Sequence, residues 1–123
     1  FSDLAPNKQS EYINKFHTVF QYINAHYMEP LTLEQASKVA CFSKYHFSRL
    51  FKQYTGTTFY DYLTLRRIRR AEELLSTSGY SVTDVALASG FSSIATFNRT
   101  FKKLKGCTPT EYCSLCRLDN RRH

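Results

Sequence analysis

The amino-acid sequence predicts an all-α fold built from two helix-turn-helix subdomains and a long connecting helix. The first observation is an internal repeat, because residues 43–62 and 93–112 align without a gap and are identical at eight of twenty positions. The second is that both copies place mainly apolar residues at the i, i+3, i+4, i+7 spacing of a helix, with Thr100 as the one polar member. The third is that a short capped helix and a tight turn precede each copy. Two copies are too few for a solenoid, so we expect one compact domain that presents the same element twice.

The chain is expected to begin with a linker or tail over residues 1–9, where little periodicity is found. The double helix-turn-helix domain is expected over residues 10–118. It opens with an apolar stripe at helical spacing that consists of Ile13, Phe16, Phe20, Ile23 and Tyr27. This stripe predicts a first helix that ends before Pro30. The helix carries no face of one charge, so we expect it to serve packing.

The first subdomain is expected over residues 10–56. Thr32 is a hydroxyl N-cap with Gln35 at N3, which predicts a short helix over Leu33–Ala40. After a turn, a longer helix is expected to end at Gly56 in the left-handed conformation. Its buried face is expected to consist of Phe47, Leu50, Phe51 and Tyr54, and its outward face of Tyr45, Ser48, Arg49 and Lys52.

The connecting segment over residues 57–76 is expected to be helical from Phe59 to Leu75. No glycine or proline interrupts it, and strong helix formers fill its second half. It carries four arginines, Arg66, Arg67, Arg69 and Arg70. These are either a solvated face with acidic partners on the same helix or contacts to the phosphates of a nucleic acid, and the sequence favours neither role.

The second subdomain, over residues 77–118, repeats the first. Ser81 and Asp84 mark the start of a short helix over Val82–Ser89, and the turn that follows is one residue longer than its counterpart. The longer helix is expected to end at Gly106. Its inward face is expected to consist of Phe97, Thr100, Phe101 and Leu104, and its outward face of Ala95, Asn98, Arg99 and Lys102.

A last helix is expected near the end of the chain. Thr108 is a hydroxyl N-cap, with Pro109 at N1 and Glu111 at N3, which together form a strong helix start. The helix is expected to fray after Cys116 and to be followed by a basic tail over residues 119–123.

The positive charge of the chain is concentrated in one region. Residues 44–105 contain eleven of the seventeen Lys and Arg residues and four of the ten acidic residues, so this region alone carries the formal net charge of +7. A basic excess that coincides with the repeated helices is the electrostatic footprint expected for nucleic-acid binding. No apolar run approaches the length of about 18 residues needed to span a membrane, so no membrane partner is expected.

A longer signature lies at fixed spacing in the second half of the chain. Its residues are Arg67, Ile68, Ala71, Leu74 and Leu75, followed by Ala86, Gly90, Phe91, Ser92, Phe97, Arg99, Phe101, Lys102, Gly106, Thr108, Pro109 and Tyr112. With this signature the chain resembles the DNA-binding domain of the AraC/XylS family of bacterial transcription regulators, over about Ile13 to Cys116. The resemblance implies seven helices, and two reading helices that enter successive major grooves on one face of double-stranded DNA.

The resemblance also implies a role. It predicts sequence-specific binding to double-stranded DNA that regulates bacterial transcription in the cytoplasm, as an activator, with repression as the open alternative, and with RNA polymerase as a partner. It predicts no enzymatic activity and no cofactor. In full-length members an effector-sensing or dimerising domain usually precedes this one, so a chain that starts at Phe1 is expected to be a fragment of a larger, effector-responsive regulator.

The candidate site residues lie mainly on the outward faces of the two reading helices. Those expected to read bases are Tyr45, His46, Ser48, Arg49, Ile94, Ala95, Asn98 and Arg99. Those expected to contact phosphates are Ser43, Lys44, Lys52, Arg66, Arg67, Ser93, Lys102 and Lys103. Arg49 and Arg99 are expected to bind guanine N7 and O6 bidentately. Ile94 and Ala95 stand where many family members carry polar residues, so we expect them to contact thymine methyl groups and to make the second half-site the less stringent one.

A second departure from the family pattern, besides Ile94 and Ala95, lies in the first turn. Cys41 stands where the family often has glycine, so the first turn is expected to be less tight or strained. Residues Cys107, Cys113 and Cys116 form a Cys-x5-Cys-x2-Cys pattern, although a structural zinc site usually has four ligands in two close pairs. One alternative interpretation is a Cys-based metal-binding domain. Another, which follows from the basic charge, is a helical module that binds RNA or another anionic partner.

Overall fold

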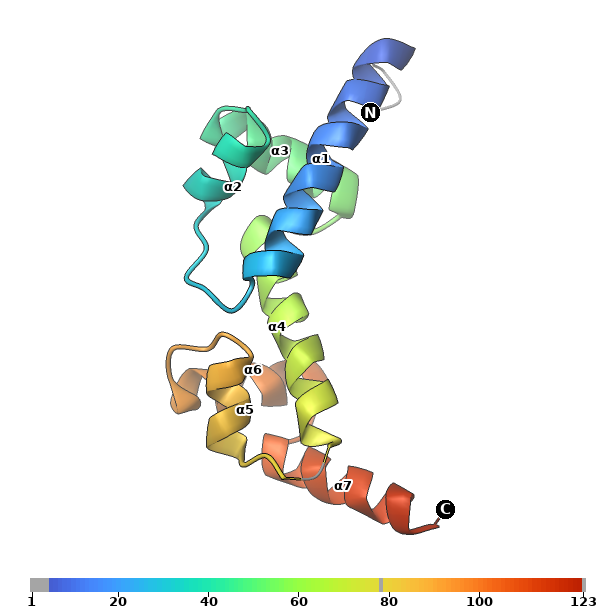
Figure 1. The fold of residues 1–123 in the computed structure, drawn as a ribbon, viewed down its shortest axis with the longest axis vertical. Coiled ribbons are helices and arrows are strands. Elements are labelled where there is room, and N and C mark those ends of the chain that lie inside the picture. Colours follow the sequence, from blue (N-terminus) through green and yellow to red (C-terminus); the bar gives the residue numbers. More distant parts are fainter. Residues whose placement is uncertain (1–4, 78, 123) are drawn as a thin grey trace. The chain divides into compact units, whose positions relative to one another are not determined.

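The computed structural model describes residues 5–77 and 79–122, with side chains described as far as Cys116. All regular structure in these ranges is helical, as expected (Figure 1). The described residues form seven helices: α1 (Pro6–His26), α2 (Leu33–Val39), α3 (Lys44–Thr55), α4 (Phe59–Leu75), α5 (Val82–Ala88), α6 (Ile94–Lys105) and α7 (Pro109–Arg122). The chain divides into two compact units, a first unit up to Leu65 and a second unit from Arg66 onward.

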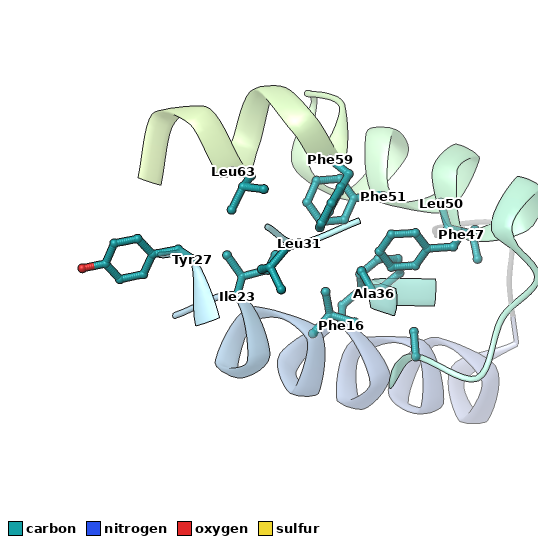
Figure 2. Packing of buried hydrophobic residues seen from close by; sticks show 12 residues of the cluster. Phe16, Ile23, Tyr27, Leu31, Ala36, Phe47, Leu50, Phe51, Phe59 and Leu63 are labelled. Atoms are coloured by element: carbon teal, nitrogen blue, oxygen red, sulfur yellow. The ribbon is translucent and has the colours of Figure 1, made fainter. Parts of the chain in front are cut away.

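The core of the first unit collects side chains from α1, α2, α3 and the start of α4. Its buried residues are Phe16, Val19, Ile23, Tyr27, Leu31, Ala36, Ala40, Phe47, Leu50, Phe51, Phe59 and Leu63 (Figure 2). Its centre is aromatic, since the rings of Phe16 and Phe47 stack with centroids 5.9 Å apart and Phe51 meets Phe59 edge-on at 5.9 Å. Aromatic pairs at such distances stabilise a core beyond the area that they bury.

The apolar stripe expected on α1 is only partly buried. Phe16 and Ile23 are fully buried, whereas Ile13 is 45% exposed. Val19 was not expected in the stripe but is fully buried, because it lies three residues after Phe16 and four before Ile23, on the same helix face. Near the start of the helix the contact is made by Tyr12, whose ring meets that of Phe42 at 5.2 Å.

The core of the second unit is smaller and less aromatic. Its buried residues are Ile68, Ala71, Leu74 and Leu75 of α4, Val85 and Ala86 of α5, Phe91, and Phe97 and Phe101 of α6. Tyr112 of α7 closes it, with its ring 5.4 Å from that of Phe101. The two repeated helices, α3 and α6, which are the expected reading helices, therefore bury the phenylalanines that the repeat places at equivalent positions. This burial fixes the direction of their outward faces.

The helix ends confirm the expected capping residues. Thr32 Oγ1 accepts a hydrogen bond from the Gln35 amide at 3.2 Å, and Gln35 Oε1 accepts one from the Thr32 amide at 3.0 Å, which completes the capping box. The reading helices end at Gly56 and Gly106, with φ of 80° and 79°. At five other helix starts the N-cap hydroxyl accepts a hydrogen bond from the amide three residues later; these residues are Ser43, Thr58, Ser81, Ser93 and Thr108.

The two short helices, α2 and α5, end with the same pair of backbone hydrogen bonds. In the first, the Cys41 amide donates to Lys38 O at 3.1 Å and the Phe42 amide to Ser37 O at 3.0 Å. In the second, Gly90 and Phe91 make the equivalent bonds at 3.2 and 3.1 Å. This is the Schellman arrangement, which needs a left-handed residue after the C-cap. Gly90 adopts this conformation without strain at φ 98°, because it has no Cβ. Cys41 adopts it at φ 60°, where its Cβ causes steric strain.

The two ends of the described chain are more helical than expected. Residues 6–9, which were assigned to a linker or tail, form the first turn of α1, with Pro6 at the start of the helix and no side-chain cap. Proline suits that position because its missing N–H is one that the first turn leaves unpaired. The last helix continues past Cys116 to Arg122. Residues 1–4 of the expected linker and residue 123 of the expected tail lie outside the described residues.

Candidate nucleic-acid interface

The outward face of α3 is exposed along its whole length. Tyr45, His46, Ser48, Arg49 and Lys52 are all exposed, as the sequence predicted. The opposite face of α3 is buried in the core of the first unit, so these side chains point away from it. The helix contains no acidic residue, so Arg49 and Lys52 have no competing carboxylate on the same helix.

Arg49 lies over an aromatic ring of its own helix. Its guanidinium carbon is 6.0 Å from the centre of the Tyr45 ring, one helical turn earlier. Tyr45 is 75% exposed, the largest exposed fraction among the large hydrophobic side chains described. Ser48, Arg49, Lys52 and Gln53 together line a surface hollow. Gln53 was not among the predicted site residues, although its position four residues after Arg49 places it on the same face.

His46 is tied to the body of the first unit more closely than its neighbours. Its ring meets that of Phe42 at 5.1 Å and that of Tyr12 at 6.2 Å, both edge-on. Its amide donates to Ser43 Oγ at 3.2 Å. The predicted base-reading histidine thus also packs against the turn and against α1, a contact that helical periodicity alone does not reveal.

The outward face of α6 is exposed but differs in chemistry. Ile94, Ala95, Asn98 and Arg99 are exposed, and Ile94 has 40% of its surface accessible. Among the described residues, Arg99 has neither an aromatic nor an acidic partner, because Ala95 occupies the position that Tyr45 has in α3. Lys102, Lys103 and Lys105 lie in the last turn of α6. Lys105 forms an ion pair with Glu72 of α4, whereas Lys102 and Lys103 are exposed.

The start of each reading helix presents a hydroxyl cap. Ser43 Oγ accepts from the His46 amide at 3.2 Å, and Ser93 Oγ accepts from the Thr96 amide at 3.1 Å. Ser93 Oγ also lies 2.8 Å from Thr96 Oγ1. These bonds give both serines a capping role, and the positive end of the helix dipole lies beside them. Lys44, also predicted to contact phosphate, pairs with Glu34 of α2 at 3.3 Å.

The four arginines of α4 differ in their environments. Arg69 is exposed, whereas Arg66, Arg67 and Arg70 are half-buried. Burial lowers the pKa of the Arg67 guanidinium from its ordinary value, but an arginine stays charged at neutral pH. Arg70 pairs with Glu73 at 3.0 Å, so part of this row has the acidic partners that the sequence allowed.

The described residues offer no group of metal ligands and no membrane-spanning helix. All four cysteines are free thiols, and Cys107 and Cys113 pack against the core of the second unit. In the described part of the chain, no group of three or more His, Cys, Asp or Glu side chains could hold a metal ion. Nor is any described helix long and apolar enough to cross a membrane.

Comparison with known proteins finds that the chain is similar to helix-turn-helix domains and to part of a transcription regulator. The family model of a helix-turn-helix domain matches residues 36–114. A helix-turn-helix-type transcriptional regulator of Staphylococcus aureus (strain COL) is 37% identical over 99 residues, which is 80% of this chain and 13% of that protein. The chain thus spans about an eighth of the length of this relative.

Solved structures show the same fold. The DNA-binding domain of AdpA, a global transcriptional factor solved in complex with a target DNA, matches with a TM-score of 0.80 and 30% identity, over 85% of this chain and 95% of that one. An AraC-type regulator from Chromobacterium violaceum matches with a TM-score of 0.76 and 28% identity, over 91% and 96%. Since the family model covers both helix-turn-helix motifs from α2 to α7, this chain belongs to the AraC/XylS-type family of helix-turn-helix DNA-binding domains, which are parts of transcription regulators and not enzymes.

Proposed function

We propose that this domain binds double-stranded DNA sequence-specifically, with α3 and α6 as recognition helices that enter successive major grooves. The observation that carries the proposal is the repeated outward face. Each helix buries its phenylalanines in its own unit and exposes an arginine and a lysine at equivalent positions, Arg49 with Lys52 and Arg99 with Lys102. A helix fits the major groove, and arginine is the side chain that most often reads guanine there.

The exposed residues of these faces divide into two chemical groups. Tyr45, Ser48 and Arg49 in α3, with Asn98 and Arg99 in α6, offer hydrogen bonds that distinguish base pairs. His46, Ile94 and Ala95 complete the proposed base-reading set. The proposed phosphate contacts are Ser43, Lys44, Lys52, Arg66, Arg67, Ser93, Lys102 and Lys103. For Lys44, binding would replace the ion pair with Glu34 by one with a phosphate.

We further propose that the domain is the DNA-binding part of a longer bacterial regulator that acts in the cytoplasm. The 13% coverage of the Staphylococcus aureus relative supports a longer protein. In that setting an effector-sensing or dimerising domain would precede this one, and the regulator would activate transcription through contact with RNA polymerase. The domain boundaries proposed are residues 10–56 and 77–118 for the two subdomains, with residues 57–76 between them.

The test is a selection of bound sequences from a random pool of double-stranded DNA, followed by affinity measurements on the enriched duplex. A bipartite site with two conserved stretches about one helical turn apart is expected. The Arg49→Ala and Arg99→Ala variants should each relax one stretch and leave the other intact. No enriched sequence, or equal affinity for an RNA duplex of the same sequence, would contradict the proposal.

A further inference from the structure

We propose that Tyr45 is a positioning residue for Arg49, and that the two side chains together read a two-base step in which a thymine or a 5-methylcytosine precedes the guanine. This inference rests on the proposed function and deepens it. It assigns α3 a dinucleotide specificity instead of two independent base contacts. The physical basis is the placement of the Arg49 guanidinium over the Tyr45 ring.

The geometry places an exposed cation over an exposed ring. The two residues are four positions apart on α3, so their side chains lie on the same helix face. The guanidinium carbon is 6.0 Å from the ring centre, within the range of a cation–π contact. Such a contact restricts the arginine rotamers and leaves the N–H fork free for a base. Preorganisation of this kind raises affinity because less side-chain entropy is lost on binding.

The high exposure of Tyr45 has no structural explanation in the first unit. The other tyrosines of α1, α3 and α4 in that unit are more covered, whereas Tyr45 leaves 75% of its surface accessible. A ring of this size beside a base-reading arginine is covered when the helix enters a groove. The apolar group that a major groove offers to such a ring is the C5 methyl of thymine.

The second unit provides a natural control. α6 carries Arg99 at the position equivalent to Arg49 but has Ala95 in place of Tyr45. Arg99 therefore lacks the ring that holds Arg49. If the ring positions the arginine, the guanine read by Arg49 must be selected more strictly than the guanine read by Arg99.

The methyl group defines the chemical specificity. A guanidinium bound to guanine O6 and N7 lies in the plane of that base at its major-groove edge. A ring packed against the face of the guanidinium then lies beside the major-groove edge of the neighbouring base. Thymine and 5-methylcytosine present the same C5 methyl group at that place, whereas uracil and cytosine do not. The pair should therefore treat TG and 5-methyl-CG alike, and should discriminate against UG and CG.

The experiment uses the purified domain and the duplex enriched from the random pool. The guanine read by Arg49 is the one whose selection is lost in Arg49→Ala. Duplexes that differ only at the preceding base, with T, U, C or 5-methylcytosine, are then compared by fluorescence anisotropy. Tyr45→Leu is compared with Tyr45→Phe, which keeps the ring, and with Tyr80→Leu, which removes an exposed tyrosine from outside the reading helices.

We expect the wild-type domain to bind the T and 5-methylcytosine duplexes about two- to fivefold more tightly than their demethylated counterparts, the range of an exposed cation–π contact and one apolar methyl contact. Tyr45→Leu keeps an apolar side chain that can contact the methyl group but removes the ring, so it should weaken discrimination for the guanine of Arg49, with an unchanged salt dependence. Tyr45→Phe should retain the methyl preference and this discrimination, and Tyr80→Leu should behave as wild type. Ala95→Tyr should sharpen discrimination for the guanine of Arg99.

The outcomes separate this inference from the function on which it rests. If Tyr45→Leu leaves the discrimination for guanine intact, Tyr45 does not position Arg49 and the inference is overturned, while the enriched site still supports DNA reading. If the methyl group has no effect on wild-type binding, the dinucleotide reading is overturned in the same way. A domain that enriches no sequence overturns both. Thermal unfolding of each variant shows whether a loss of binding comes from a loss of fold.

Discussion

The two units of the chain share a backbone plan and differ in the side chains that carry it. Each has a short capped helix, a Schellman turn and a reading helix that ends at a left-handed glycine. The equivalent positions that differ include three pairs: Cys41 corresponds to Gly90 after the short helix, Ala40 to Ser89 at its C-cap, and Tyr45 to Ala95 on the reading helix.

In both units the residues that determine the fold are distinct from the residues on the outward face. Backbone bonds and buried phenylalanines are the same in both units, so the reading helices keep the same inward face. The outward faces have changed from a polar and aromatic surface on α3 to a partly aliphatic one on α6. A repeat that is duplicated in architecture can therefore read two unlike half-sites, and substitutions at equivalent positions measure how unlike they are.

The largest expected effects come from the two cores. Phe51→Ala and Phe101→Ala should each lower the free energy of unfolding by about 3–5 kcal/mol, since both rings are fully buried. Phe51 should be the costlier, because its ring meets five other aromatic rings and that of Phe101 meets two. Urea unfolding followed by circular dichroism measures both. Equal losses would show that ring packing adds nothing to burial here.

The next effects concern the two arginines. Arg49→Ala and Arg99→Ala should each weaken binding to the selected duplex by about 1–3 kcal/mol and relax the preference at one base pair. Arg49→Ala should be the larger loss, since the Tyr45 ring holds that guanidinium over its helix. Titration against the selected duplex and against random duplexes separates the contribution of base reading from that of phosphate contact. Equal weakening on both duplexes would reduce these arginines to phosphate contacts.

The turns should respond in opposite directions to exchange of their left-handed residue. Cys41→Gly should raise the free energy of unfolding by about 1 kcal/mol, because a side chain at φ 60° is strained and glycine is not. Gly90→Ala should lower it by about the same amount or more, since Gly90 holds φ 98°. The control is Cys41→Ala, which removes the thiol and keeps the strain. If Cys41→Ala stabilises as much as Cys41→Gly, the backbone account is wrong.

A smaller effect is expected at the C-caps of the short helices. Ser89 Oγ is fully buried and has no hydrogen-bond partner among the described residues, whereas the equivalent residue in the first unit is Ala40. Ser89→Ala removes this unsatisfied hydroxyl and should stabilise the domain by about 1 kcal/mol. Ala40→Ser should destabilise it. Ser37→Ala is the contrasting case, because Ser37 Oγ donates to Glu34 O at 2.8 Å, and it should bring no gain.

The smallest expected effects belong to the equivalent lysines. Lys52→Ala and Lys102→Ala should each flatten the dependence of log affinity on log salt by about 0.9 and weaken all sequences alike. Both side chains are exposed on faces without acidic neighbours on the same helix. Unchanged slopes would remove both lysines from the phosphate contacts. A change in slope at one lysine alone would show that only the reading helix of that unit contacts a DNA phosphate through its lysine.

Much of the fold follows from the sequence because local signals agree with burial. The hydroxyl caps at Thr32, Ser81 and Thr108 and the glycines after α3 and α6 set helix ends to within a residue or so. The spacing of the phenylalanines predicted which faces of α3 and α6 are buried. The start of α1 was missed because Pro6 follows no capping side chain, and a helix start without a cap has no local signature.

The site was predictable in outline but not in detail. Helical periodicity places Tyr45, Arg49 and Arg99 outward, and the structure has them exposed. Periodicity does not indicate that Arg49 lies over Tyr45 or that His46 packs against Phe42, since side-chain rotamers decide these contacts. Tyr54 and Leu104, both expected inward, are 43% and 42% exposed, since each lies in the last turn of its helix. The ring of Tyr54 still faces α1, because it stacks on the rings of Phe16 and Phe20 with centroids 5.3 and 5.9 Å apart.

Helix α4 has a consequence for how the domain folds. Phe59 and Leu63 in its first half are buried in one core, while Ile68 and Leu75 in its second half are buried in the other. An isolated helix of this length is marginal in water, so each half depends on a core to stay ordered. Once one core has formed, the helical nucleus exists and the other half extends it at little further cost in entropy. The two units are thus expected to unfold cooperatively, with the amides of α4 among the last to exchange their hydrogens with solvent.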